Sequence, residues 1–394
     1  MGMTRGEWIG ACGALAAGEG VASLVPQGAD CWPAVAIVAV LAVLFGYGLG
    51  ICGWRFAAIF LVGVALFFHA SVGEERMYRD SPWMRNVRRR VSEKAPDNPV
   101  RMALSRRVGI GLEHDPLAAN LNRAILLGER KRLPWKVRKT FVASGTMHVF
   151  AISGLHVMLV AKVLVLAMLL LMVPMRWAGA VAILPLWGYV AVVGAPPSAV
   201  RAAVMATFYF LAPVFWRKSD SLMAWALTFL LTHVYDPTLI GNVGCLLSFA
   251  VMLAILFALD LGSGLGKGLK MSLWVTFAAW LMGVPISAHV FGQVTPGGLL
   301  ANLPLLAAAG FTVISGIVGL GASFVSETLA AHLNNLAALF TEAMVGVSGA
   351  VAQIPGSNFE IVKWPLWMCA LWYVAVLLSL YLVRRVKARR CGII

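Results

Sequence analysis

The chain has 394 residues, of which 60% are hydrophobic and 12% are charged, and its formal net charge is +15. A soluble globular domain has about a quarter of its residues charged. The composition therefore excludes a soluble domain and indicates a membrane protein. The six cysteines form no C-x-x-C pair, so we interpret them as packing residues without a disulfide framework.

Apolar runs near the roughly 20 residues needed to cross a bilayer recur from end to end. We predict an all-α polytopic membrane protein with about 12 (11–12) transmembrane helices, the first and the seventh being the weakest. Pro and Gly separate neighbouring runs. The expected spans are 8–25, 34–51, 54–71, 148–173, 177–194, 198–216, 221–235, 239–259, 272–291, 297–321, 328–352 and 364–383.

The distribution of Lys and Arg predicts the orientation of these spans. When the N-terminus is placed in the cytoplasm, cations gather on the inner side of the membrane, as the positive-inside rule requires. Apart from residues 74–147, the outer side receives only Arg201 and Lys363. Both termini are therefore expected to be cytoplasmic.

Residues 74–147 form a segment that departs from this distribution. It holds 17 Lys and Arg residues and 8 Asp and Glu residues, so its net charge of +9 is most of the +15 of the chain. Threading places the segment outside, where the positive-inside rule does not explain its charge. Two kinds of anionic partner are compatible with this charge, the headgroups of lipids and the phosphates of DNA.

Short amphipathic helices are expected within this basic segment, because apolar residues recur at helical spacing among the cations. They contain Trp83 to Val91, Val100 to Val108, and Trp135 to Phe141, and Pro134 opens the last. Period-2 alternation is scarce, so we predict no β-barrel.

Residues 140–173 differ from an ordinary anchoring helix. The run is apolar enough to enter a bilayer from Val149 onward, yet it holds His148, Ser153, Gly154 and His156. Each polar group in hydrocarbon costs about 2 kcal/mol or more unless a partner satisfies it. A Ser-Gly step is tolerated where the backbone breaks or lines a cavity. We therefore predict a broken, cavity-facing helix.

The ten residues from His148 to Val157, HVFAISGLHV, resemble the H-L-L-A-I-S-G-L-H-V signature of the ComEC competence family at eight positions. The run from Ala124 to Glu129 is similar to the family's A-L-L-L-G-D run. The resemblance covers about residues 124–383 and implies a channel for single-stranded DNA in the bacterial cytoplasmic (inner) membrane. The expected parts are N-terminal transmembrane helices (1–73), the basic extramembrane segment (74–147), a channel core (148–384) and a basic cytoplasmic tail (385–394).

Further polar residues lie in segments that resemble family motifs. Residues 194–203 resemble G-x-x-P-S-x-x-R-A, and residues 289–304 resemble H-F-G-Q followed by G-L-L-A-N-L. Residues 236–249 resemble D-P-x-x…G-x-Q-L-S-F, with Cys245 where the family usually has Gln. The resemblance and the cost of polar groups in lipid together predict a lining for the DNA path: His148, Ser153, Gly154, His156, Arg201, Asn242, Ser248, Gln293 and Asn302.

Plainer interpretations of these residues stay open. Arg201 is also consistent with snorkelling to the membrane interface, Ser248 with a hydrogen bond to its own helix, and the histidines with structural hydrogen bonds. His148 and His156 are about 80° apart around a helix and have no accompanying carboxylate, so we expect no metal and no cofactor. Lys162 and Glu342 are intramembrane charges that we expect to pair.

The predicted function is transport of single-stranded DNA during natural transformation, by a channel that is not an enzyme. No G-x-x-x-x-G-K-[ST] or H-x-H-x-D-H motif occurs. Expected partners besides DNA and the bilayer are therefore a DNA receptor, a nuclease and a cytoplasmic ATP-driven helicase or translocase. A small-solute or lipid transporter, or a non-transporting membrane platform, is the alternative. The cations expected to gather DNA are Arg88, Arg89, Arg90, Arg106, Arg107, Arg130, Lys131 and Arg132.

Overall fold

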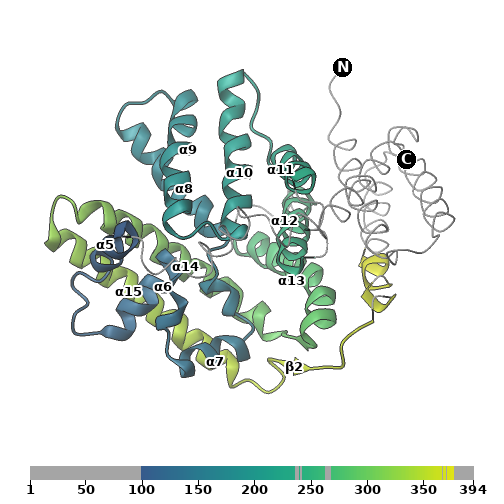
Figure 1. The fold of residues 1–394 in the computed structure, drawn as a ribbon. Helices are drawn as coiled ribbons and strands as arrows, with labels where there is room; N and C mark the ends of the chain where they lie inside the picture. Colours follow the sequence, from purple (N-terminus) through teal and green to yellow (C-terminus); the bar gives the residue numbers. More distant parts are fainter. Residues whose placement is uncertain are drawn as a thin grey trace, which may run out of the picture. The chain divides into compact units, whose positions relative to one another are not determined.

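The computed structural model describes residues 99–235, 239, 242–261, 268–365, 367–369 and 371–376. Helices make up most of this part of the chain (Figure 1). Strands occur there only as a short antiparallel pair, β1 (Gln293–Val294) with β2 (Phe359–Glu360). The expectation of an all-α protein is confirmed in this coarse sense.

Six helices are long and apolar enough to cross a membrane, by length and composition. They are α9 (Met175–Val192), α10 (Pro197–Leu211) continued by the turn η4 (Ala212–Phe215), α12 (Val243–Leu261), α13 (Leu269–Phe291), α14 (Gly297–Ala322) and α15 (Glu327–Ala352). Three apolar helices are shorter: α8 (Gly154–Leu170), α11 (Ser221–Tyr235) and Trp367–Val376.

Each of these helices coincides with an expected span, which identifies a multi-pass membrane protein with six candidate spans. The expected spans at 8–25, 34–51 and 54–71 lie outside the described residues, as do residues 377–394. The total of about 12 spans stays a prediction.

The described chain divides into two compact units. The first contains residues 99–137, 148–249 and 306–345, and the second contains residues 138–147, 250–305 and 346–376.

In the first unit, α5 (Pro99–Arg107) and α6 (Pro116–Leu127) precede the turn η2 (Arg130–Arg132). The α6 helix begins where the Asp115 carboxylate accepts the Ala118 N–H (3.0 Å) and ends at Gly128, which has a φ of 72°. Only a residue without Cβ adopts that left-handed conformation at little cost. The sequence pattern does not predict α6, because polar residues interrupt its apolar run.

Buried amides join α6 to α15 within this unit. The Asn122 side chain donates to the Asn334 carbonyl (3.1 Å), and the Asn334 side chain donates to the carbonyls of Arg107 and Ile110 (both 3.0 Å). Asn122 and Asn334 are fully buried. A buried amide is costly unless it is bonded, so these contacts fix how α6 lies on α15.

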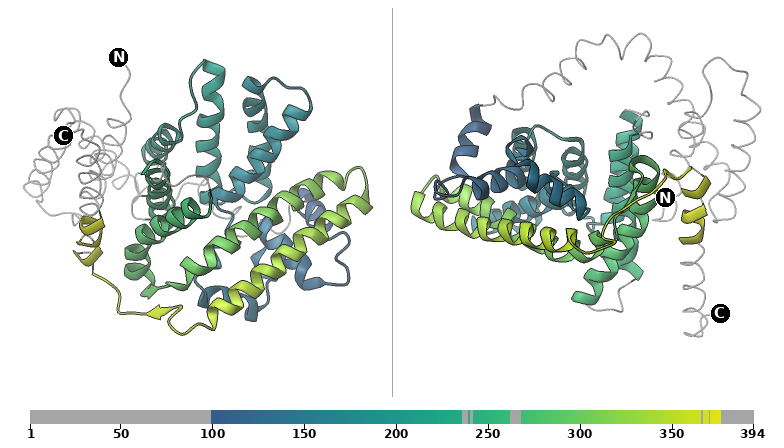
Figure 2. Two further views of the ribbon diagram at one scale, coloured as in Figure 1. Left: turned by 180° about the vertical axis from the view of Figure 1, so that it is seen from behind. Right: turned by 90° about the horizontal axis from the view of Figure 1, so that it is seen from below.

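Helices α14 and α15 lie side by side in both views of Figure 2. Within the first unit their contact includes Phe311 stacked on Phe340, with 4.8 Å between ring centroids. Gly316 of α14 faces Leu126 of α6 so closely that a Cβ on Gly316 would collide with the leucine. Small residues thus let these helices approach closely, as is common in membrane proteins.

Helices α8, α9 and α10 pack against one another in the first unit (Figure 1). Their contacts are lined by fully buried alanines, which again permit a close approach. The Tyr189 hydroxyl of α9 donates to the Leu126 carbonyl at the end of α6 (3.0 Å). The buried alanines are Ala161, Ala178, Ala182, Ala199, Ala203 and Ala206.

In the second unit, three buried hydroxyls form a closed triangle. Ser144 lies 2.6 Å from Thr146 and 3.1 Å from Ser348, and Thr146 lies 2.8 Å from Ser348, all measured between side-chain oxygens. Ser144 and Thr146 follow α7 (Trp135–Ala143), and Ser348 lies in α15. Hydroxyls both donate and accept, so each of the three buried groups has partners within the protein.

A pair of glycine substitutions in α14 tests the packing of α6. We expect Gly316→Ala to lower stability by about 1–3 kcal/mol, because the new methyl group overpacks the contact with Leu126. Gly321→Ala is the matched control, since nothing lies within 4 Å of a Cβ there. The apparent melting temperature in detergent is the measurement, and equal effects of the two substitutions would contradict the close contact.

Candidate functional site

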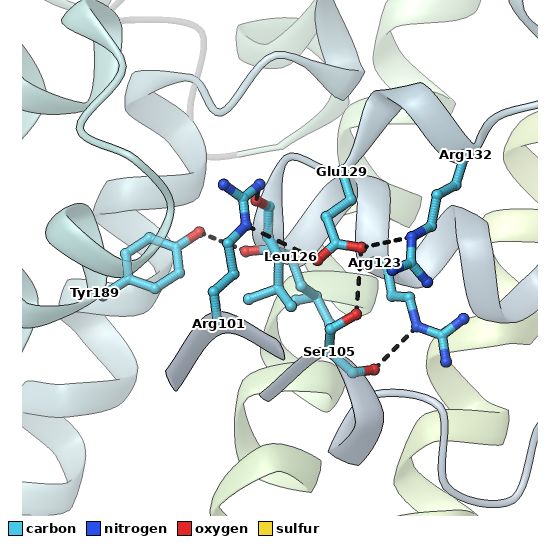
Figure 3. Close-up of polar contacts among 8 residues, drawn as sticks. Arg101, Ser105, Arg123, Leu126, Glu129, Arg132 and Tyr189 are labelled. Atoms are coloured by element: carbon cyan, nitrogen blue, oxygen red, sulfur yellow. Dashed lines mark hydrogen bonds and ion pairs between the residues drawn. The ribbon is translucent and has the colours of Figure 1, made fainter. Parts of the chain in front are cut away.

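The Glu129 carboxylate is surrounded by cationic and polar groups (Figure 3). Its Oε2 lies 3.1 Å from the Arg132 Nε and accepts the Ser105 hydroxyl (3.2 Å), and its Oε1 lies 3.8 Å from the Arg101 Nε. Arg123 donates to the Ser105 carbonyl (2.9 Å). The Glu129 carboxylate, which follows α6, therefore joins α5 to the turn η2.

Arg101 is the buried cation of this cluster. Its side chain is only 8% exposed, and its Nη2 donates to the Leu127 carbonyl at the end of α6 (2.6 Å). Burial lowers the pKa of the Arg101 guanidinium, and the charge of Glu129 counteracts this shift. Burial also lowers the pKa of Arg123, with a contribution from the charge of Arg132. Arg101 thus keeps its charge by pairing with Glu129 rather than by contact with water.

The anchored turn η2 presents its cations outward. Arg130, Lys131 and Arg132 are all exposed, and Arg130 also donates to the Phe150 carbonyl (2.8 Å). Trp135, at the first position of α7, is 73% exposed, and Lys136 beside it is exposed as well. We call residues 130–136 the basic loop. It combines cations with one accessible aromatic ring.

The other cations expected to gather DNA have different surroundings. Arg106 is exposed. Arg107 is half-buried, donates to the Ser323 carbonyl (2.6 Å) and lies 4.1 Å above the Phe324 ring. Arg107 therefore fastens α5 to the end of α14. Arg88, Arg89 and Arg90 lie outside the described residues.

The expected break in residues 148–173 is present. The turn η3 (Met147–Phe150) is followed by non-helical residues, and α8 begins only at Gly154. The Ser153 backbone N–H donates to the His156 Nδ1 (3.3 Å), and the Ser153 hydroxyl lies 2.9 Å from the same nitrogen. His148 is exposed and His156 is buried. The Ser-Gly step thus starts a new helix, and His156 caps it.

Helix α10 holds this break in place. The Ser198 hydroxyl donates to the Ile152 carbonyl (2.7 Å). A Cβ on Gly154 would lie 3.7 Å from the Ala202 Cβ, so α8 and α10 approach closely at their first turns. These contacts satisfy a backbone carbonyl that the break leaves outside the helix.

Arg201 lies on α10 three residues after Ser198 and is buried, with 9% exposed. Its Nη2 donates to the Gly244 carbonyl (3.0 Å) and its Nε to the Ser248 hydroxyl (3.3 Å), both on α12. These contacts do not fit the snorkelling interpretation, because the Arg201 guanidinium bonds to groups of the protein. They also give Ser248 a role beyond bonding to its own helix.

The other predicted lining residues are Asn242, just before α12, Gln293 in β1 and Asn302 in α14. Asn242 is exposed and its Oδ1 accepts the Cys245 N–H (3.1 Å) at the start of α12. Gln293 pairs with Glu360 in the β1–β2 strand pair, and Asn302 is half-buried in α14. Gln293 and Asn302 belong to the second unit, whereas the structure brings Ser153, Gly154 and His156 together with α10 in the first.

Several residues that organise the site were not predicted as site residues. Glu129 was noticed only as part of a motif, and Arg101, Asn122 and Tyr189 were not singled out. An Asn or Arg within an apolar helix pattern was the available signal, because such a residue needs a bonding partner.

One expectation about intramembrane charges has a structural answer. The expected pairing of Lys162 with Glu342 is wrong, since both side chains are exposed and no ion pair between these two described residues is present. Within the described residues, no group of three or more His, Cys, Asp and Glu side chains could hold a metal. Cys245 and Cys369 are buried free thiols, which confirms the interpretation of these two as packing residues.

Comparison with known proteins gives two findings. The family model described as Competence protein matches residues 125–386. ComE operon protein 3 of Bacillus subtilis (strain 168) is 29% identical over 207 residues, which are 52% of this chain and 26% of that protein. The match thus spans about a quarter of that relative. No solved structure matches.

Substitution of Glu129 tests whether this carboxylate anchors the basic loop. We expect Glu129→Gln to destabilise the protein by about 3 kcal/mol, because Arg101 stays buried without its counter-charge. Arg132→Gln is the control and should cost at most about 1 kcal/mol, since its side chain is 54% exposed. Apparent melting temperatures in detergent measure both, and an equal or larger effect of Arg132→Gln would refute the anchoring role.

Proposed function

The chain belongs to the competence protein family, and on that premise we propose that it passes single-stranded DNA across the bacterial cytoplasmic membrane during natural transformation. The observation that carries the proposal is the basic loop, residues 130–136. This loop directly follows the motif that ends at Glu129 and holds exposed cations beside an exposed tryptophan.

A single strand is the form of DNA that such a loop fits best. Proteins that bind single strands without sequence preference combine cations, which follow the phosphates, with aromatic rings on which bases stack. Lys131 and Lys136 supply charge, and Trp135 supplies an accessible ring between them. In a duplex the bases are already stacked on each other, so the ring would gain nothing from it.

We assign the membrane passage to the region around the first turns of α8 and α10. The support is chemical: Ser153, His156, Ser198 and Arg201 are polar groups gathered where two apolar helices begin. Such residues are costly within a bilayer and usually mark a pathway for a polar substrate. The two helices approach through Gly154 and Ala202, so the backbone there carries no bulky side chains.

The rest of the assignment follows from the same proposal. The protein acts as a channel without catalysis, and a DNA receptor, a nuclease and a cytoplasmic ATP-driven helicase or translocase are its proposed partners. About 12 spans with both termini in the cytoplasm of a bacterial cell complete the topology.

The salt dependence of DNA binding tests the role of the loop cations. We expect the purified protein in zwitterionic nanodiscs to bind a fluorescent oligothymidylate less tightly as salt rises, because bound phosphates release counterions. The double variant Lys131→Gln/Lys136→Gln should lower the slope of log K against log salt by about 1.4. The control Lys270→Gln/Lys363→Gln removes two other exposed lysines and should keep the wild-type slope.

Fluorescence anisotropy across a salt series is the measurement. A wild-type protein that binds no strand, or a slope that falls equally in both double variants, would contradict the DNA role and favour a small-solute or lipid transporter.

Trp135 gives an independent prediction at fixed salt. Loss of one stacked base costs about 1–3 kcal/mol, so Trp135→Ala should weaken oligothymidylate binding by about 5–150-fold. Trp367→Ala is the control, because Trp367 is also an exposed tryptophan, with 63% exposed against 73% for Trp135. Transformation frequency of cells that carry each variant should follow the same order, and equal frequencies would exclude a stacking role.

A further inference from the structure

His156 is a buried histidine with one ring nitrogen that has no partner. The residue is 2% exposed, and its Nε2 makes no hydrogen bond. Its Nδ1 accepts the Ser153 backbone N–H (3.3 Å). A backbone N–H can only donate, so Nδ1 is the acceptor and the hydrogen of the neutral ring lies on Nε2. His156 therefore offers an unused N–H donor inside the protein.

An unused buried donor is unfavourable, because it has lost its bonds to water and gained none. Native structures rarely leave such a group, and each instance calls for an explanation such as strain, a function, a bound water or a bound ion. The helix cap does not require the donor, since capping uses Nδ1 alone. The free nitrogen therefore indicates an acceptor that comes from outside the described chain.

The charges near His156 indicate the sign of that acceptor. Arg130 and His148 are the two side chains whose charges act on the His156 ring, and both are basic. Both side chains are exposed. His156 also belongs to the first turn of α8, a helix of 17 residues. The N–H groups of a first turn have no acceptor within the helix and carry partial positive charge.

We propose that His156, Arg130, His148 and the first turn of α8 form a binding site for one phosphodiester group. A phosphate oxygen would accept the Nε2 hydrogen, and the two basic side chains would neutralise its charge. Oxyanions at helix N-termini beside Arg are bound in this way in many proteins.

Two sources supply this chemistry, a nucleic-acid strand and an anionic lipid headgroup. The first deepens the proposed function, because Arg130 is also part of the basic loop and would pass the strand from that loop towards α8. The contacts of α10, Ser198 to the Ile152 carbonyl and Ala202 to Gly154, hold the first turn in position for either ligand.

The test compares His156→Leu with His332→Leu in the full chain. Leucine removes the free donor and also the Nδ1 acceptor of the helix cap, so His156→Leu should fold with a modestly lowered melting temperature. His332 is an exposed histidine of α15 whose Nδ1 lies 2.7 Å from the Thr328 carbonyl, and its substitution controls for the loss of a ring. The probes are an oligothymidylate with phosphodiester linkages and one with uncharged methylphosphonate linkages.

In phosphatidylcholine nanodiscs we expect His156→Leu to weaken binding of the phosphodiester strand at least tenfold and to leave methylphosphonate binding unchanged. His332→Leu should match the wild type for both probes. A His156→Leu protein that binds both strands like the wild type would overturn the site, and the DNA function would stand if Lys131→Gln/Lys136→Gln still lowers the salt slope.

Nanodiscs with phosphatidylglycerol separate the two sources. The Nε2 resonance of ¹⁵N-histidine-labelled protein, assigned by its absence in His156→Leu, should shift when the phosphodiester strand binds in phosphatidylcholine discs. A shift caused by phosphatidylglycerol alone identifies the lipid headgroup as the ligand, even for a protein that binds no DNA. No shift with the strand or with phosphatidylglycerol would refute the site.

Discussion

The pairing of Glu129 with the arginines around it is the interaction on which the surface of the first unit depends. The carboxylate holds Arg101 from α5, accepts Ser105 and pairs with Arg132 of the turn that follows α6. Because Arg101 is buried, loss of its partner Glu129 would leave an uncompensated charge inside the protein, at a large cost in folding free energy. The turn is thereby fixed, and its remaining cations together with Trp135 must point outward. The accessible charge of the basic loop is thus a consequence of a buried ion pair beneath it.

A shortage of acids shapes the rest of the fold. The chain has 32 Lys and Arg residues but only 17 Asp and Glu residues, so carboxylates cannot pair with every cation. Several arginines bond instead to backbone carbonyls at or just beyond the ends of helices, where the last carbonyls have no partner within the helix and carry partial negative charge. Each such bond joins two helices or turns and gives the carbonyl a partner. The carbonyls belong to Leu127 for Arg101, Ser105 for Arg123, Ser323 for Arg107, Val214 for Arg176 and Phe150 for Arg130.

The start of α8 connects this surface with the apolar helices. Ser153 and His156 cap the start of α8. The Ser198 hydroxyl of α10 donates to the Ile152 carbonyl just before it. Arg130 bonds to Phe150 only a few residues earlier in the chain. The basic loop and the helix break are therefore neighbours in the first unit. This adjacency is the physical basis for proposing that a polyanion passes from one to the other.

The sequence by itself determined the protein class, the position of every span within the described residues, the break at Ser153–Gly154 and the family. These features are local, because hydropathy, helix breaking and a ten-residue motif are all properties of consecutive residues. The tertiary structure decided the roles of the individual cations. Arg107 and Lys131 look alike in a basic segment, yet Arg107 bonds to Ser323 more than 200 residues away, whereas Lys131 is exposed. A helical period tells which face of a helix a residue occupies, but only packing determines which helix lies against that face.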